Sequence, residues 1–505
     1  MGKNNSRKWL LLIIIACASF VIALDSTFMN VAITSLVKDL NTDIGTIQTI
    51  ITFYTLITAS LMLVGAKLQD IYGQKKIFLI GAIFYGVGTF IASISQSAPM
   101  LFFGWSLLEG IGGALMTPAT LSIVSRTYTG KDRTIALSIV SAMAGIAAAI
   151  GPLFGGFVTT FLSWRFGFAV ELIVIIFIFV FSKEIKDFEP ISTGRFDKLG
   201  SILSIFGLVV LVIGILAINS DFVQFSPFII VFAIIILAIF YYYENKLKNN
   251  GNEPLFDVSM LKIKNLSVGS IIRLIASVAL AGALFSISIF LQSVMKIDAF
   301  TTGLTLVPLT IGLLLFALIS PRLTNYISHK LIICFGFVIS IIGALLLRFN
   351  FGLDIDLITL LPGMFLLGGG LGFVISLILD LALNEIEKKD QASASGFIST
   401  SANLGISMGT AVIGTILILG AFGGLYDAID QYYPEKIDDA HFKEDAKNYV
   451  NKVGTLSEDQ KENYHVKEIS NIIVFNAMKL VMNVIILILI IGLGLSFTLK
   501  NIKYS

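Results

Sequence analysis

Charged residues are the class that this chain lacks most. Asp, Glu, Lys and Arg make up 13% of its 505 residues, about half of the ~25% typical of soluble domains. Hydrophobic residues make up 56%, and the mean hydropathy is +0.90. These values exclude an ordinary soluble protein and predict helices that cross a lipid bilayer. A net charge of only +2 gives no sign of a nucleic-acid partner.

Cysteine and histidine are also scarce. Cys17 and Cys334 lie in apolar runs, and the three histidines are scattered, so neither a disulfide framework nor a metal site is expected. No G-x-x-x-x-G-K-[ST] loop and no soluble nucleotide domain are found, which argues against a primary pump. The predicted inner loops hold no dense cluster of acids or histidines, so we expect no enzyme, no metal and no cofactor. The first apolar run is too long for a cleavable signal peptide.

Long apolar runs dominate the rest of the chain. Each is long enough, or nearly so, for a helix that crosses the bilayer. Fourteen spans are predicted, over residues 9–36, 46–66, 77–95, 99–123, 134–161, 165–182, 199–219, 226–243, 267–294, 301–320, 331–348, 357–381, 393–422 and 471–498.

Basic residues orient these spans. With the N-terminus inside, the predicted cytoplasmic segments hold 23 of the 35 Lys and Arg. The short external loops hold four, and the acidic external loop 423–470 holds six. Because basic residues favour the cytoplasmic side, we expect a multi-pass cell-membrane protein with both termini in the cytoplasm. Loop 423–470 is read as a solvated acidic loop, with a functional gate as the alternative.

The chain contains an internal repeat. The stretch "GAKLQDIYGQKKIFLIG" (65–81) aligns with "SPRLTNYISHKLIICFG" (320–336) at an offset of 255. The stretch "LLEGIGGAL" (107–115) echoes "FLLGGGLGF" (365–373) at an offset of 258. We therefore expect an all-α polytopic membrane protein: a six-helix bundle over 1–190, an inserted helix pair over 191–265, and a second six-helix bundle over 266–505. Such parallel repeats are a transporter architecture, with the substrate site near the midplane between the halves.

Five stretches carry a family resemblance: "LDSTFMNVAI" (24–33), "GAKLQDIYGQKK" (65–76), "LLEGIGGALMTPA" (107–119), "GIAAAIGPLFGG" (145–156) and "EPLFDVSML" (253–261). Together and in this order, they resemble the signature stretches of the major facilitator superfamily, in particular its fourteen-helix drug:proton antiporters. The resemblance implies alternating access by two rocking bundles. It also implies export of amphipathic, often cationic, compounds in exchange for protons.

Two of these motifs also have a physical interpretation. In the stretch 65–76, Gly65 and Gly73 are expected to permit a tight loop. Asp70 of this stretch is expected to pair with Arg126 as a gate at the cytoplasmic end. Lys75 and Lys76 fit ordinary positive-inside charge. In the second, small residues and a proline predict a kinked, closely packed helix, and the resemblance links this stretch to antiport; its residues are Gly145, Gly151, Pro152, Gly155 and Gly156.

Acids within the spans are the main functional candidates. Asp25 and Glu109 each lie 17 residues from a cytoplasmic basic residue, about 25 Å at ~1.5 Å per residue, so a similar depth is expected. Glu171 is expected nearer the outside and Asp380 nearer the inside. A buried carboxylate can load and release a proton and can bind a cation in competition with it. The structural alternative is a protonated acid that bonds a neighbour such as Ser26, Thr27 or Asn30.

Departures from the family pattern affect this prediction. The usual span-4 Arg and Gln are replaced by Ser106 and Glu109, and Glu171 stands where the family usually has Asn. Arg273 either pairs with an acid or anionic substrate, or extends to the cytoplasmic edge. Candidate substrate-lining residues are Tyr54, Met116, Met143, Arg273, Phe290, Gln292 and Asn403.

These observations favour a monomeric secondary exporter. Its expected partners are a small-molecule substrate, protons and membrane lipid. The alternative is an exporter of a lipid, glycolipid or anionic metabolite, with a different coupling ion.

Overall fold

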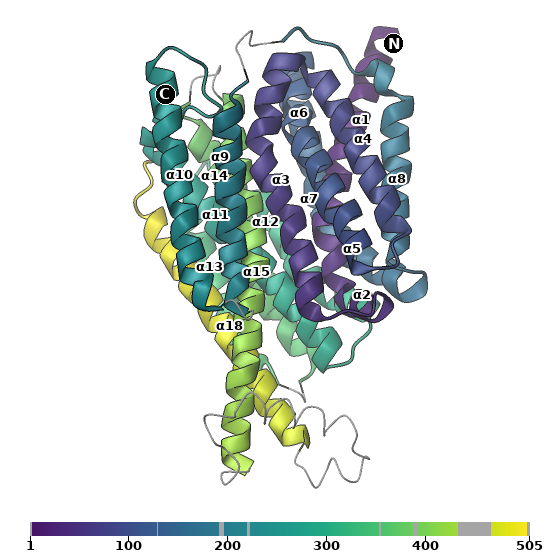
Figure 1. Ribbon diagram of the computed structural model, residues 1–505, viewed down its shortest axis with the longest axis vertical. Coiled ribbons are helices and arrows are strands. Elements are labelled where there is room, and N and C mark those ends of the chain that lie inside the picture. The colour runs from purple at the N-terminus through teal and green to yellow at the C-terminus, as the bar shows by residue number, and fades with distance from the viewer. Residues whose placement is uncertain are drawn as a thin grey trace.

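The computed structural model describes residues 3–128, 130–190, 196–219, 223–352, 355–386, 391–432 and 466–501. Within these ranges the ordered elements are helices, and no strand occurs. Both chain ends lie at the same end of the helical bundle (Figure 1), here called the termini end. The all-α polytopic fold expected from the sequence is therefore confirmed.

In the N-terminal half, α1 packs mainly on α7, whereas α3 and α4 pack on α6. The fourth span runs without a break through α5, the π-helix η2 and α6. The bounds are α1 Lys3–Phe28, η1 Met29–Val31, α2 Ile33–Asp39, α3 Ile44–Tyr72, α4 Gln74–Ser93, α5 Ala98–Leu101, η2 Phe102–Glu109, α6 Gly110–Thr127, α7 Gly130–Phe161, α8 Arg165–Val180 and η3 Ser182–Glu184.

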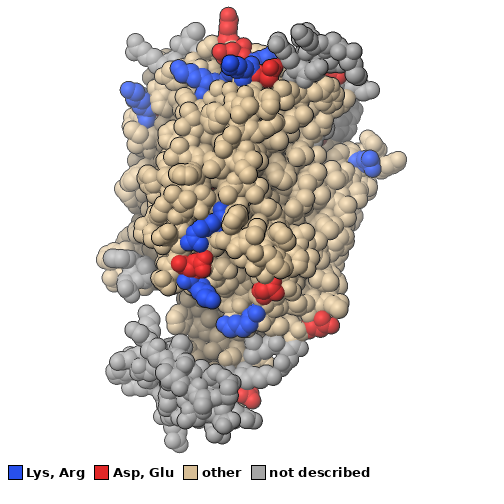
Figure 2. Space-filling view, turned by 90° about the vertical axis from the view of Figure 1, so that its right-hand side faces the viewer, with Lys and Arg blue, Asp and Glu red and all other residues tan. Residues whose placement is uncertain are grey.

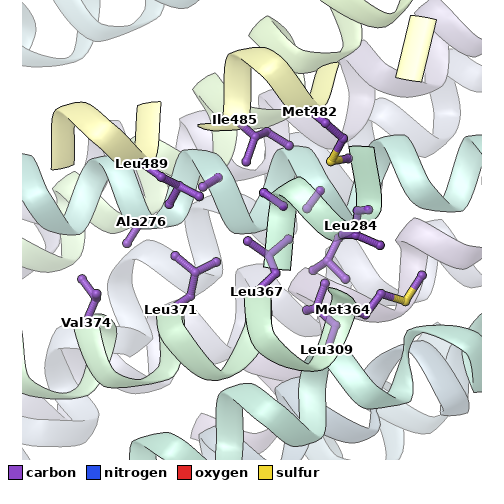
Figure 3. Close-up of a cluster of buried hydrophobic side chains, with 14 of the residues drawn as sticks. Ala276, Leu284, Leu309, Met364, Leu367, Leu371, Val374, Met482, Ile485 and Leu489 are labelled. Atoms are coloured by element: carbon purple, nitrogen blue, oxygen red, sulfur yellow. The ribbon is translucent and has the colours of Figure 1, made fainter. Parts of the chain in front are cut away.

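The C-terminal half forms a second bundle. Its bounds are η6 Val258–Lys262, α11 Lys264–Ile289, η7 Phe290–Val294, α12 Ala299–Leu323, α13 His329–Asn350, η8 Leu357–Leu360, α14 Leu361–Leu383, α15 Gln391–Tyr432 and α18 Val466–Ser496. Apolar side chains from α11, α12, α14 and α18 meet in one buried cluster that includes Leu284, Leu309 and Leu367 (Figure 3). Apolar faces on several helices are thereby removed from lipid and fix the packing of this half.

The inserted pair consists of α9 (Lys198–Leu216) and α10 (Ser226–Asn249), with the short turns η4 Ala217–Asn219 and η5 Val223–Phe225 between them. These two helices pack on each other, and α9 also contacts α3 and α15. The pair thus lies beside the place where the two halves meet. The three-part division at residues 190 and 265 stays a prediction.

The span count nearly matches the prediction. Thirteen helices of the described chain have the length and composition to cross a membrane. The sixth predicted span, 165–182, is the exception, because α8 has only 16 residues. At ~1.5 Å per residue it measures about 24 Å. We count α8 as the fourteenth span, since its mostly apolar sequence packs against α1 and α4 within the bundle.

The surface agrees with a membrane location. Figure 2 shows a broad belt almost free of charge between two ends where Lys, Arg, Asp and Glu gather. Many large apolar side chains of the belt are exposed, such as Ile173, Phe228 and Leu318. Such an area on a soluble protein would mark a very large contact surface, whereas lipid covers it in a membrane protein.

The halves meet along two helix pairs, α3 with α15 and α7 with α12. In the first pair, Gln48 donates from Nε2 to the Thr410 carbonyl at 3.0 Å. In the second, Thr310 donates from Oγ1 to the Ala149 carbonyl at 2.9 Å. At the end opposite the termini, Thr34 donates to Gln292 Oε1 at 2.5 Å. Polar side chains therefore join the halves at several depths.

Helices α15 and α18 project beyond the bundle at the end opposite the termini (Figure 1). The sequence predicts spans that end at 422 and begin at 471, but α15 continues to Tyr432 and α18 begins at Val466. The first ten residues of the predicted loop 423–470 are thus helical, packed through a small cluster that contains Leu425, Ala428 and Ile469. Residues 433–465 of that loop lie outside the described residues.

Glycine contacts show that the repeat is structural. In each half, the third span packs against the fourth through two close glycine pairs, where a Cβ would collide with backbone. The pairs are Gly81 with Gly112 and Gly88 with Gly104 in the N-terminal half, and Gly336 with Gly370 and Gly343 with Gly363 in the C-terminal half. Gly81 and Gly88 correspond to Gly336 and Gly343 at the sequence offset of 255, and Gly112 corresponds to Gly370 at the offset of 258. Gly104 corresponds to Gly363 at an offset of 259, one residue more.

Candidate functional site

Three acids of the N-terminal half converge in the interior. Asp25 from α1, Glu109 from the end of η2 and Glu171 from α8 are all fully buried, with an exposed fraction of 0%. One carboxylate oxygen from each lies within 4.8 Å of those from the other two. No Lys, Arg or His of the described chain forms an ion pair with any of them. We call Asp25, Glu109 and Glu171 the acidic cluster.

Asp25 is the member with hydrogen-bond donors. Trp105 Nε1 donates to Asp25 Oδ1 at 2.9 Å and to Oδ2 at 3.0 Å, and the Tyr54 hydroxyl also approaches this carboxylate. The Tyr54 ring stacks on the Trp105 indole, with centroids 5.4 Å apart. Because donors stabilise the ionised form of a carboxylate, Asp25 is the best-supported anion of the cluster.

Glu109 and Glu171 lack such support. None of their carboxylate oxygens accepts a hydrogen bond from a donor among the described residues, although the buried Tyr85 hydroxyl faces them. A buried charge without a partner is strongly unfavourable. These two side chains therefore need protons or a bound cation, and the arrangement can hold and release positive charge.

A π-helix positions Trp105 and Glu109. The segment Phe102–Glu109 has the wider turn of a π-helix, and Ser106 seats it by donating from Oγ to the Ile50 carbonyl of α3 at 2.7 Å. Gly104 and Gly112 are eight residues apart, whereas their C-terminal counterparts Gly363 and Gly370 are seven apart. The extra residue lies within the π-helix, a type of insertion that is frequent at functional sites.

The expected depths are partly confirmed. Asp25 and Glu109 lie side by side as their counts of helical rises predict, and Glu171, expected nearer the outside, joins them. The neighbours Ser26, Thr27 and Asn30 do not bond Asp25: each donates to backbone carbonyls of its own helical segment. The sequence did not identify Trp105 or Tyr85, although Trp105 precedes Glu109 by four residues, a spacing that places both on one helix face.

Asp380 lies apart from the acidic cluster. It is near the termini end of α14, where its side chain is 63% exposed, and its Oδ2 is 3.0 Å from Nε2 of the buried His329. Asp380 therefore lies toward the end of the bundle that its sequence position predicts, but outside the acidic cluster. Its role in coupling stays a prediction.

The loop motif is only partly as predicted. Gly73 separates α3 from α4 with a φ of 92°, a conformation that glycine adopts without strain. Gly65 is not in the loop, since α3 continues to Tyr72; a Cβ there would lie 2.6 Å from the Ala114 carbonyl oxygen of α6. Lys75 and Lys76 begin α4. Gly65 thus serves helix packing, a role that its spacing alone did not reveal.

The expected pair between Asp70 and Arg126 is absent from the described structure. Arg126 instead donates to the Glu189 carbonyl at 3.1 Å and lies over the Phe188 ring at 4.7 Å. Arg126 therefore fixes the segment that leaves α8, and Asp70 interacts with it only at longer range.

The helix α7 packs on both halves through its glycines. A Cβ on Gly151 or Gly155 would collide with Thr27 or Phe28 of α1, and one on Gly156 with Ala299 of α12. From the other side, a Cβ on Gly303 would lie 2.3 Å from the Pro152 carbonyl oxygen, and one on Gly145 would lie 3.1 Å from Leu314 Cδ1. The predicted close packing is confirmed; the link to antiport stays a prediction.

Comparisons with known proteins agree with this fold. A family model described as Major Facilitator Superfamily matches residues 15–220 and 196–410. The chain belongs to the major facilitator superfamily. Members of this superfamily are generally non-enzymatic carriers, and the chain is a secondary transporter of the cell membrane.

Its relatives in the superfamily include transporters of drugs and antibiotics. The chain is 27% identical to the probable actinorhodin transporter of Streptomyces coelicolor, over 83% of this chain and 74% of the relative. It is 26% identical to the multidrug transporter protein MdtP of Bacillus subtilis, over 81% and 76%. It is also 25% identical to the riboflavin transporter RibZ of Clostridioides difficile, over 80% and 87%.

A solved structure supports the fold. It is a bacterial homologue of the human lysosomal transporter Spinster, in an inward-facing and occupied conformation. It aligns over 97% of this chain and 96% of its own length, with a TM-score of 0.60 and 12% sequence identity. At this identity the likeness concerns the superfamily fold alone.

The predicted substrate-lining residues are dispersed through the transporter. Tyr54 belongs to the surroundings of the acidic cluster. Met116 lies in the N-terminal hydrophobic core, whereas Met143 is half-buried on α7. Asn403 donates to the Ser399 carbonyl of its own helix at 3.1 Å, and Gln292 joins the halves through Thr34.

One apolar pocket of about 230 Å³ lies between the halves, near the end opposite the termini. Helices α3, α11, α15 and α18 and the short π-helix η7 line it, with Gln48, Phe285, Phe290 and Met478 among its residues. Of the predicted lining set, Phe290 is the residue that faces this pocket. Its volume is below the ~300–1,000 Å³ of typical ligand sites, so in this conformation it fits only part of a drug-sized molecule.

Proposed function

We propose that this transporter exports amphipathic, often cationic, compounds in exchange for protons. The observation that carries the proposal is the acidic cluster: three fully buried carboxylates with no basic residue of the described chain paired to them. Their mutual repulsion and burial favour uptake of positive charge. The names of relatives such as the multidrug transporter of Bacillus subtilis support a drug substrate.

The two functions of the site lie in different places in this proposal. The acidic cluster has no exposed surface in this conformation, whereas the apolar pocket near Phe290 is lined almost entirely by apolar side chains. We infer that protons bind within the N-terminal half, and that the apolar part of the substrate binds between the halves. The two conformations of the transporter would differ in how α1 packs on α7. A change in the charge of the cluster would then favour one of these conformations.

The bias of basic residues supports a cytoplasmic location for the termini end. Protons would enter from the opposite side and leave at the termini end. Substrate would move in the reverse direction. The transporter is proposed to act as a monomer.

The experiment is dye efflux from proteoliposomes with an imposed pH gradient. We expect a lipophilic cationic dye to be transported by the wild type, and gradient-driven transport to be lost in Asp25→Asn and Glu109→Gln. Asp380→Asn is the matched control, because Asp380 is an exposed acid outside the cluster. Unchanged transport in both cluster variants would reduce these acids to structural groups.

One observation favours a second candidate, an exporter of anionic metabolites. Arg273 of α11 makes a single side-chain hydrogen bond among the described residues, to the Ile375 carbonyl at 3.5 Å. Its guanidinium therefore retains donors for an anionic group. In the same proteoliposomes, transport of an anionic dye that Arg273→Gln abolishes and Glu109→Gln spares would support this candidate.

A further inference from the structure

Two carboxylates outside the acidic cluster face each other at the termini end of the inserted pair. Asp197 caps the N-terminus of α9, and Glu244 lies near the C-terminus of α10. Their exposed fractions are 6% and 0%. Acids so close to a helix end normally reach water, so their burial calls for a cause.

Their facing oxygens lack donors. An added Cβ on Gly200 would lie 2.2 Å from Asp197 Oδ2 and 2.1 Å from Glu244 Oε1, so both oxygens border the same small space. Neither oxygen accepts a hydrogen bond from the described residues. Two ionised carboxylates that border the same small space would repel each other. One shared proton converts their contact into a hydrogen bond.

The other two oxygens are already occupied. Asp197 Oδ1 accepts from the Gly200 backbone N–H at 2.9 Å and from the Tyr243 hydroxyl at 3.2 Å. Glu244 Oε2 accepts from the Phe256 backbone N–H at 3.4 Å. These donors hold each carboxylate in place, with its unpartnered oxygen directed at the other acid.

Nearby charged groups do not supply the missing partner. On α9, Lys198 is exposed. On α10, Lys248 pairs with Asp257 at 2.6 Å, and on α3, Lys67 pairs with Glu253 at 2.7 Å. Tyr243 is the titratable side chain that touches the pair. The described surroundings thus provide room for a proton and no basic side chain.

The pair holds a segment that touches both halves. Residues 253–260, here called the linker segment, follow α10. Within this segment, the Phe256 backbone N–H donates to Glu244. The Phe256 ring stacks on Phe397 of α15, with centroids 4.6 Å apart, while Glu253 pairs with Lys67 of α3. Leu255 and Phe256 are buried in a cluster that also contains residues of α3, α11, α14 and α15.

We propose that Asp197 and Glu244 share one proton, and that this proton holds the linker segment in its place between α3 and α15. The site is distinct from the acidic cluster and does not depend on the proposed substrate. With the proton bound, Glu244 fixes the Phe256 backbone. Without it, repulsion between the carboxylates displaces Glu244, and the linker segment loosens.

The sign of the pH dependence follows from this. We call the arrangement with the linker segment held in place closed, and the one with the segment loosened open. The closed arrangement binds a proton that the open arrangement releases, so the closed arrangement is favoured at low pH and lost as pH rises. Because one proton is released on opening, the ratio of open to closed forms grows about tenfold per pH unit beyond the transition.

The test is hydrogen exchange of the full-length protein in lipid nanodiscs, from about pH 5 to about pH 9, a range that brackets shifted carboxyl titrations. Exchange rates are corrected for the intrinsic effect of pH. In the wild type, we expect amides of the linker segment to exchange faster with rising pH, approaching about tenfold per unit. In Glu244→Gln, the amide donates permanently to Asp197, so protection should persist at every pH.

Three further measurements make the result decisive. Glu253→Gln is the matched control: it removes the ion pair with Lys67 and lowers protection of the linker segment at every pH, but it should keep the wild-type slope because it leaves the acid pair intact. The infrared band of a protonated carboxyl group at low pH should be weaker in Glu244→Gln than in the wild type. A pH-independent wild type, or the same slope in Glu244→Gln, would overturn the proposal; protection restored at high pH by Na⁺ or Mg²⁺ would replace the proton by a metal cation.

Discussion

The two halves of this transporter share a scaffold and differ in chemistry. Each half packs its third span on its fourth through two pairs of glycines, at matching positions of the repeat. The backbone N–H that faces Gly88 belongs to Glu109, and the one that faces Gly343 belongs to Leu367. The same place in the scaffold is therefore an acid in one half and part of the hydrophobic core in the other.

The difference shows how a charged site was added to a packing unit. In the N-terminal half, one extra residue is accommodated by the π-helix Phe102–Glu109 between the two glycine contacts. Trp105 and Glu109 project from this segment to Asp25 and Glu171. The C-terminal half keeps the shorter spacing and fills the same region with Leu367 and Leu371 (Figure 3).

Exchanging the residue types of Glu109 and Leu367 should have the largest effect. Glu109→Leu, which copies the C-terminal half, should abolish gradient-driven dye efflux while the protein still folds. Leu367→Glu, which copies the N-terminal half, places an acid in a core without Trp105 or a partner and should cost about 2.5–3.5 kcal/mol. Efflux from proteoliposomes measures the first effect, and denaturant unfolding in detergent measures the second. Normal efflux with Glu109→Leu would refute the asymmetry.

Adding one methyl group at equivalent glycines should test the shared scaffold. In Gly88→Ala, the Cβ would lie 2.5 Å from the Gly104 carbonyl oxygen, and in Gly343→Ala, 2.3 Å from the Leu367 backbone nitrogen. Backbone cannot move aside cheaply, so each substitution should destabilise its half by about 1–3 kcal/mol. Gly145→Ala is the control, because its Cβ would meet only the flexible end of Leu314 at 3.1 Å. Thermal unfolding checks all three.

Removal of the indole donor should sharpen the comparison further. Trp105→Phe retains a ring but loses both hydrogen bonds to Asp25. Hydrogen bonds to charged groups contribute about 1.5–3 kcal/mol, and a loss of this size is expected in denaturant unfolding. In the Asp25→Asn background, the same substitution should cost less, since the acceptor is no longer charged. Equal costs in both backgrounds would show that the indole acts by packing alone.

The smallest effect is expected at the termini end, where the halves again differ. Gln74 donates to Ser122 in the N-terminal half, and the repeat offsets of 255 and 258 place His329 and Asp380 at the matching positions. Asp380 is 63% exposed, so Asp380→Ser should change stability by no more than about 1 kcal/mol. A larger change in the unfolding midpoint would mean that this pair anchors α13 to α14.

Part of the fold could be predicted because it follows from local rules. The length of an apolar run sets whether a helix can span the membrane, and the balance of basic residues gives the proposed orientation. Gly73 could be assigned to a turn because it lies within a polar stretch between two apolar runs. The depth of Asp25 and Glu109 could be counted, since a helix rises by a fixed amount per residue.

The remaining assignments depended on which side of each helix meets which neighbour. Counting rises places Asp380 nearer the inside, but it cannot tell that Glu171 turns inward to the acidic cluster or that Asp380 is exposed. It also cannot tell that Gly65 packs on α6 or that Arg126 binds the segment after α8 instead of Asp70. Ser26, Thr27 and Asn30 were plausible partners for Asp25 by sequence, but helical geometry directs their hydrogen bonds to their own carbonyls.

The sequence by itself thus determined a helical membrane protein with a repeated bundle and acids at a common depth, because hydrophobic length and helical rise act along one chain. Only the tertiary structure decided that Trp105 supplies the donor to Asp25, that Glu171 completes the acidic cluster, and that Asp197 meets Glu244. Each of these contacts joins helices far apart in sequence. Their rotation and close approach are set by packing over the whole bundle, which no local pattern records.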